Sequence, residues 1–163
     1  MSFKTWSKQF YPIAADRTKT GLPAIEHSLR KWEGLTKASL KKHGLVQDDR
    51  YIQEKDRDFV AEDKNFLCVD ESSCALCVHY FDEAEDYWST CNDCPLYKVR
   101  GTACDRALDE AGAVSDSPFR SWTYYGNAQP MINLIKKARI AFIAVEADKK
   151  RLKKNAKRKA TLR

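Results

Sequence analysis

Apolar residues recur at helical spacing near the start of the chain. Ile25, Leu29 and Trp32 lie three or four residues apart, which places them on one face of a helix. The preceding Gly21-Leu-Pro23 is a favourable start, because proline in a first helical turn lacks only an N–H that would be unpaired anyway. Gly34 is a plausible stop. The pattern therefore predicts a helix that opens at Gly21–Pro23 and ends at Gly34.

A second short helix is expected directly after the first. Thr36 can cap it, Leu40 would face inward, and Gly44 lies just past its end at Lys42. The residues before Gly21 are interpreted as extended. Residues 1–46 should thus form an extended segment followed by two short helices with a tight connection.

The most regular apolar pattern lies near the C-terminus. Asn127 can cap a helix there, and Pro130 fits its first turn. Apolar residues then follow a 4-3 rhythm, interrupted only by Lys149, at Met131, Ile135, Ala138, Phe142, Val145 and Leu152. This predicts one long helix whose apolar surface packs on two neighbouring elements, or whose stripe stays exposed and docks on a partner. The same stripe would suit the seam of a helical dimer, so the oligomeric state stays open.

Two Cys-x-x-Cys pairs lie between these helical regions. Cys74 and Cys77 form the first pair, Cys91 and Cys94 the second, and thirteen residues separate them. Two such turns that face each other supply four thiolates to a tetrahedral Zn²⁺ at about 2.3 Å. The spacing predicts one structural zinc ion, with Cys104 or His79 as possible substitute ligands. A disulfide framework and an iron–sulfur cluster use the same residue type and stay open as alternatives.

The predicted zinc is structural rather than catalytic, because four cysteines leave no open position for water. The chain has no His-Glu-x-x-His motif and no phosphate-binding glycine-rich loop, so we predict no enzyme activity. Metal binding would supply folding energy, on the order of 10 kcal/mol in isolated zinc peptides. Cys68 lies in an apolar, strand-like run, Phe66–Val69, and is interpreted as a small buried hydrophobic residue.

These elements define the predicted fold class. It is an α-rich, small α+β domain in which a central four-cysteine zinc knuckle packs against short N-terminal helices and a long C-terminal helix. Residues 47–126 hold an acidic segment with short strand pieces, the knuckle, and the aromatic run Phe119–Tyr125, which we expect to join the core. Together with 1–46 and 127–163 they should form one compact domain, as a length of 163 residues suggests.

Charge is distributed unevenly along the chain. The net charge is +6, yet residues 149–163 contain nine bases and no acid, so residues 1–148 carry 29 − 9 = 20 bases against 23 acids. Such a tail can bind DNA or RNA without sequence preference, or can act only as a solubilising helix end. The candidate nucleic-acid contacts are Lys149, Lys150, Arg151, Lys153, Lys154, Lys157, Arg158 and Lys159.

The surroundings of the predicted knuckle are acidic. Asp82, Glu83, Glu85 and Asp86 lie between the two cysteine pairs, where they would repel a polyanion. They predict either a solvated loop or a face that docks on a basic partner surface.

Neither a secretory signal nor a membrane-spanning stretch is found in the sequence, which predicts a cytoplasmic protein without a membrane partner. The run Glu26-His-Ser-Leu-Arg-Lys-Trp-Glu-Gly-Leu35, the two Cys-x-x-Cys pairs, Gly101-x-x-Cys104 and Ser117-Pro-Phe-x-x-Trp122 resemble small uncharacterised cysteine-rich proteins of tailed bacteriophages. The resemblance implies an accessory protein in an infected bacterial cytoplasm. We expect it to bind a host protein or nucleoprotein complex, for example to inhibit host machinery or defence; the alternative is a nucleic-acid-binding accessory protein that uses the basic tail.

Overall fold

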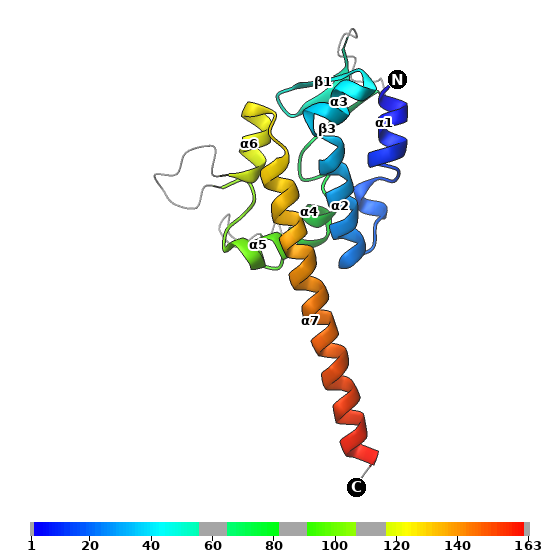
Figure 1. Ribbon diagram of the computed structural model, residues 1–163, viewed down its shortest axis with the longest axis vertical. Helices are drawn as coiled ribbons and strands as arrows, with labels where there is room; N and C mark the ends of the chain where they lie inside the picture. The colour runs from blue at the N-terminus through cyan, green and yellow to red at the C-terminus, as the bar shows by residue number, and fades with distance from the viewer. Residues whose placement is uncertain (1, 56–64, 82–90, 107–116, 162–163) are drawn as a thin grey trace.

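The structure is a computed structural model that describes residues 2–55, 65–81, 91–106 and 117–161. Within these ranges it is rich in helix and has one small sheet, in agreement with the coarse fold class predicted from the sequence (Figure 1). The elements in chain order are α1 (Phe3–Phe10), the 3-10 helix η1 (Ala15–Arg17), α2 (Leu22–Gly34), α3 (Lys37–His43), β1 (Leu45–Asp48), β2 (Tyr51–Glu54), β3 (Phe66–Cys68), α4 (Ala75–Tyr80), α5 (Pro95–Arg100), α6 (Pro118–Tyr125) and α7 (Gln129–Thr161).

Helices α2 and α3 form as the sequence predicts. Proline occupies the first turn of α2, and the Thr36 hydroxyl accepts a hydrogen bond from the Ser39 amide at 3.3 Å to cap α3. Gly44 ends α3 in the left-handed region at φ 70°, a conformation that glycine adopts at little cost.

The N-terminal segment differs from the prediction. It was expected to be extended, but residues 3–10 form α1, which buries Phe3 and Trp6. These two residues are three apart, so they lie on one face of a single helical turn. The Thr5 hydroxyl pairs with Ser2 at the start of this helix.

The sheet is a three-stranded antiparallel meander in the order β1-β2-β3. Asp48 pairs with Tyr51 across a two-residue turn, in which Asp49 has a positive φ of 48°. Ile52 is fully buried on the central strand, opposite Leu67 of β3. The short strand predicted at Phe66–Val69 is thereby confirmed over Phe66–Cys68, and it leads into the first cysteine pair.

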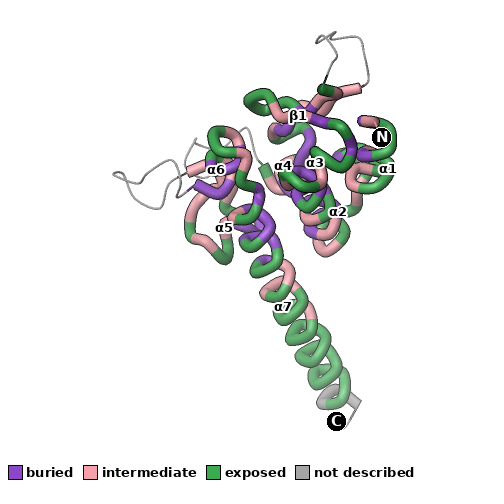
Figure 2. Tube along the Cα trace, turned by 45° about the horizontal axis from the view of Figure 1, so that its top comes forward, coloured by how far each residue is buried: buried purple, intermediate pink, exposed green. Residues whose placement is uncertain are grey.

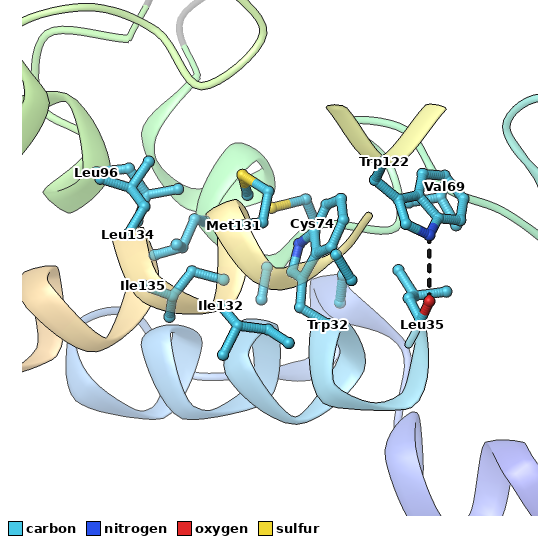
Figure 3. Close-up of a cluster of buried hydrophobic side chains, with 14 of the residues drawn as sticks. Trp32, Leu35, Val69, Cys74, Leu96, Trp122, Met131, Ile132, Leu134 and Ile135 are labelled. Atoms are coloured by element: carbon cyan, nitrogen blue, oxygen red, sulfur yellow. Dashed lines mark hydrogen bonds between the residues drawn. The ribbon is translucent and has the colours of Figure 1, made fainter. Parts of the chain in front are cut away.

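The core is organised around α2. Three tryptophans, Trp6, Trp32 and Trp122, are almost fully buried, and two of them complete the C-terminal end of this helix. The indole N–H of Trp6 donates to the Gly34 carbonyl at 2.8 Å. The indole N–H of Trp122 donates to the Leu35 carbonyl at 3.2 Å (Figure 3). Helix ends leave carbonyls without partners, so these bonds tie α1 and α6 to the same point.

Gly34 is required where α1 crosses α2. A Cβ at this position would lie 2.5 Å from Phe10 Cγ and 2.6 Å from Phe10 Cβ, distances that force the backbones apart. We expect Gly34→Ala to lower the free energy of unfolding by about 1–3 kcal/mol, despite alanine's higher helix propensity. Urea denaturation would measure this. Gly101→Ala, where a Cβ meets nothing within 4 Å, is the control and should show only the smaller effect of left-handed strain. A Gly34→Ala protein as stable as the wild type would contradict the overlap.

Helix α7 packs on the domain over only its first half. Met131, Ile135 and Ala138 are buried against the domain, but Val145 and Leu152 are 52% and 64% exposed. The expected packing of the apolar stripe on neighbouring elements therefore extends only as far as Phe142, and the stripe beyond it is exposed. Figures 1 and 2 show the helix leaving the domain and continuing as a separate rod. None of the described helices, α7 included, is long and apolar enough to cross a membrane.

The aromatic run Phe119–Tyr125 is likewise buried in part and exposed in part. Trp122 is fully buried, and its ring meets that of Trp32 edge to face at 5.6 Å. Phe119 lies against Trp32 at 6.1 Å, as expected for a core residue. Tyr124 and Tyr125, however, are 66% and 57% exposed, so the expectation that the entire run joins the core is wrong for these two.

Candidate metal centre

The two cysteine pairs are presented by two short helices. Cys74 immediately precedes α4 and Cys94 immediately precedes α5, and both residues are buried. Cys77 lies in the first turn of α4, and the Cys94 amide donates to the Cys91 carbonyl at 2.9 Å. The tight turns that the Cys-x-x-Cys spacing predicts are thus present in both pairs.

A polar loop fixes the position of Cys74. The Asp70 carboxylate accepts hydrogen bonds from the Ser73 amide at 3.0 Å and from the Ser72 hydroxyl at 2.7 Å. The Ser73 hydroxyl in turn accepts from the Asp70 amide at 3.0 Å. These reciprocal bonds form a closed turn from Asp70 to Ser73, so the chain enters α4 in one defined direction.

The sulfurs of Cys74 and Cys77 interact directly. A hydrogen bond from the Cys77 thiol holds the pKa of Cys74 well below its usual value, and Lys31 and the amides of Cys77 and Leu76 act in the same direction against burial. The same sulfur–sulfur bond, together with burial, raises the pKa of Cys77. Within the pair, Cys74 is therefore the more acidic thiol.

Three further thiols belong to the same electrostatic group. Burial raises the pKa of Cys94 to about 12, and the charges of Cys74 and Cys91 add to this effect. Burial is also the largest cause that raises the pKa of Cys104, and the charges of Cys74 and Cys94 raise it further. The structure thus brings Cys104, a predicted substitute ligand, into electrostatic contact with both cysteine pairs.

The four predicted ligands do not form a finished metal site. Among the described residues, no three Cys, His, Asp or Glu side chains are placed so that together they could hold a metal ion. No disulfide joins any of the six cysteines, all of which lie in the described ranges. The thiols are therefore gathered but not arranged around one point, and the predicted zinc stays a prediction.

Two other residues of metal-binding type lie near the pairs in sequence, His79 and Cys68. Each has a partner outside the two cysteine pairs. His79 Nε2 lies 3.0 Å from the Thr18 carbonyl oxygen and 3.1 Å from the Thr18 hydroxyl, so it joins α4 to the segment after η1. Cys68 is half-buried rather than buried as expected. Burial, and then a hydrogen bond to Asp70, raise the pKa of its thiol. Both residues have structural partners that a metal would have to displace.

The predicted acidic docking face lies outside the described residues. Asp82, Glu83, Glu85 and Asp86 all belong to the range 82–90, which the structure leaves undescribed. Their proposed contact with a basic partner therefore stays a prediction from the sequence.

Helix α2 contributes three residues to the centre that sequence reasoning missed. The Ser28 hydroxyl lies 3.9 Å from Cys74 Sγ. Lys31 is 1% exposed, and its ammonium donates to the Ser73 carbonyl at 2.8 Å and to the Ser73 hydroxyl at 3.1 Å. Trp32 packs beside Cys74 (Figure 3). The sequence signal for Lys31 is its spacing. Residues 24, 28, 31 and 35 follow a 4-3-4 rhythm, which places this lysine on the buried face of the helix.

Comparison of the whole chain with protein-family models, with curated proteins and with solved structures gives no match.

Proposed function

We propose that this protein is a non-catalytic accessory protein that binds nucleic acid through the free half of α7, on a domain held together by a zinc–thiolate centre. The setting implied by the phage resemblance is the cytoplasm of an infected bacterium. The observation that supports the proposal is the projection of α7, since a basic tail packed on its own domain could not reach a polyanion.

The free part of α7 has the length and the charge for this task. Residues 143–161 span roughly 28 Å at 1.5 Å per residue. Seven basic side chains from Lys149 to Arg158 are all exposed (Figure 2). At about 100° per residue they cover roughly 200° of the helix circumference, so the helix can contact phosphates on both sides of a groove.

Two ion pairs strengthen the point at which the helix leaves the domain. Glu146 pairs with Lys149 at 2.8 Å, and Asp148 pairs with Arg151 at 3.2 Å. Both acids precede their bases by three residues, the arrangement that supports an exposed helix. At the packed end, Arg139 pairs with Glu26 of α2, which fixes the direction of α7.

Removing residues 149–163 tests the proposal. The truncated protein should lose most of its affinity for mixed-sequence DNA and RNA, because phosphate contacts dominate non-specific binding. Fluorescence anisotropy at several salt concentrations would measure this, and the wild type should lose roughly 10³-fold in affinity between 50 and 200 mM salt if about six phosphates are contacted. The control is the melting temperature, which should not change, since no side chain in this segment is buried within the described residues. Undiminished binding by the truncated protein would refute the role of α7.

A second candidate function is docking on a host protein, which the exposed apolar side chains of α7 favour. Ile140, Val145 and Leu152 are all more than half exposed although they are large and apolar. If this surface binds a protein, Val145→Gln with Leu152→Gln, which adds no charge to the basic helix, should abolish capture of one defined partner from nuclease-treated bacterial lysate, while nucleic-acid affinity changes little. Sedimentation of the wild type over a range of concentrations would show whether the partner is instead a second copy.

A further inference from the structure

Lys31 is an unusual residue for the interior of this domain. Its side chain is buried, and among the residues that the structure describes no carboxylate lies within 4 Å of its ammonium. Its hydrogen bonds to Ser73 are made to neutral oxygens. Burying an ammonium without an anion costs several kcal/mol of folding free energy. Such a lysine therefore indicates that a group close to it carries a negative charge.

The negative charge that best accounts for Lys31 is sulfur. Burial lowers the pKa of Lys31, and the charges that oppose this effect, in order of size, are those of Cys74, Cys77 and Asp70. The first cysteine pair thus opposes the effect of burial on the pKa of Lys31 more strongly than the Asp70 carboxylate does. The ammonium has three N–H groups and uses two on Ser73, which leaves one for another acceptor.

The other side chains of α2 that face Cys74 are also hydrogen-bond donors. Ser28 has a hydroxyl 3.9 Å from the Cys74 sulfur. Trp32 is 1% exposed, and its buried indole N–H has no hydrogen-bond partner among the residues that the structure describes. Figure 3 shows this nitrogen on the side of the ring that faces Cys74 and Met131. A neutral thiol is a weak hydrogen-bond acceptor, whereas a negatively charged thiolate can accept hydrogen bonds from several donors.

We infer that Lys31 is the buried counter-charge of a metal–thiolate centre that contains Cys74, with Ser28 and Trp32 as additional donors to its sulfur. The ligand is a thiophilic divalent ion of the Zn²⁺ class. This inference rests on the metal centre and not on nucleic-acid binding, so the two can fail separately.

The charges of such a centre explain why a lysine is needed. Four thiolates around a divalent ion carry a net charge of −2 in the protein interior, and one ammonium reduces this to −1. Each ligand thiol releases its proton to solvent as the metal binds. Residues that touch ligands without binding the metal typically change its affinity 10–100-fold when they are replaced. Lys31 should therefore affect metal affinity although it is not a ligand.

The test compares Lys31→Met and Lys31→Gln with the wild type in the full-length protein. Zn²⁺ content is measured by elemental analysis, and affinity by competition with a chromophoric chelator. We expect one Zn²⁺ per wild-type chain and a 10–100-fold lower affinity in both variants. Glutamine keeps a donor for Ser73 without the charge, so equal losses assign the effect to charge. Arg30→Gln, next along the same helix and exposed, is the matched control and should keep wild-type affinity.

A second readout separates this role from a purely structural one. In metal-free protein, Lys31→Met should keep or raise the melting temperature, because an uncompensated ammonium is removed from the interior. An equal loss of stability with and without metal would mean that Lys31 only anchors Ser73, and the inference would be wrong. Wild-type protein without bound metal, or variants with unchanged Zn²⁺ affinity, would overturn it as well. If Lys31→Met does not fold, the affinity of Lys31→Gln decides.

Discussion

Cys74→Ser should remove the proposed Zn²⁺ and lower the melting temperature by more than about 10 °C. The reason is that the mutation takes away both a proposed ligand and the only thiol within the described residues whose pKa is held well below its usual value by its neighbours. Metal binding by a small domain contributes folding free energy directly, and about 1 kcal/mol corresponds to roughly 2–4 °C in a domain of this size. Differential scanning calorimetry with elemental analysis of the same samples would measure both effects.

Two controls make this result specific. Cys68→Ser replaces a half-buried cysteine whose partners are Asp70 and Tyr51 rather than the other thiols, so metal content should not change. Chelation of the wild type should reproduce the melting temperature of Cys74→Ser. If the chelator leaves the wild-type transition where it was, the folding energy of this domain comes from its tryptophan core and not from a metal.

Neutralising four lysines of α7 should weaken nucleic-acid binding by roughly 10²–10³-fold near 0.1 M salt. Glutamine at Lys149, Lys150, Lys153 and Lys154 removes four positive charges and keeps good helix propensity. The slope of log affinity against log salt should become shallower by about 3.6 for duplex DNA, since each lost phosphate contact removes about 0.9. Anisotropy titrations at four or five salt concentrations would give the slope directly.

The matched control removes the same number of charges from the domain. Lys4 and Lys8 on α1 and Lys41 and Lys42 on α3 are all exposed and distant in sequence from α7. Glutamine at these four positions should change the salt slope much less. If the two quadruple variants behave alike, net charge rather than the projecting helix governs binding, and the proposed site is wrong.

The local parts of this fold are predictable from the sequence. Thr36 and Gly44 mark the ends of α3 by side-chain and backbone chemistry that acts within a few residues, and Pro23 does the same for α2. The Cys-x-x-Cys spacing likewise predicts the two tight turns. None of these signals depends on what packs against the segment, and each is confirmed.

The features that the sequence did not reveal depend on the arrangement of distant segments. Val145 and Leu152 continue the periodicity of Met131, yet the domain ends before the helix does, so they lie in solvent. The sequence pattern assigned no role to Lys31, whereas α2 carries its buried ammonium to Ser73, the residue before Cys74. Which sulfurs approach each other is likewise decided by how α4 and α5 pack, and this brought Cys104 into the group.

The separation of α7 from its domain has a consequence for how the molecule meets a partner. Residues 1–148 carry a net charge of −3 and residues 149–163 carry +9, with most of the positive charge at the far end of a rod. The protein therefore has a large electric dipole moment along its longest axis. In the field of a polyanion it would turn before contact and arrive tip first, with its body held away from the surface. Collisions in other orientations would be rarer, and this preference would fade as added salt shortens the range of the field.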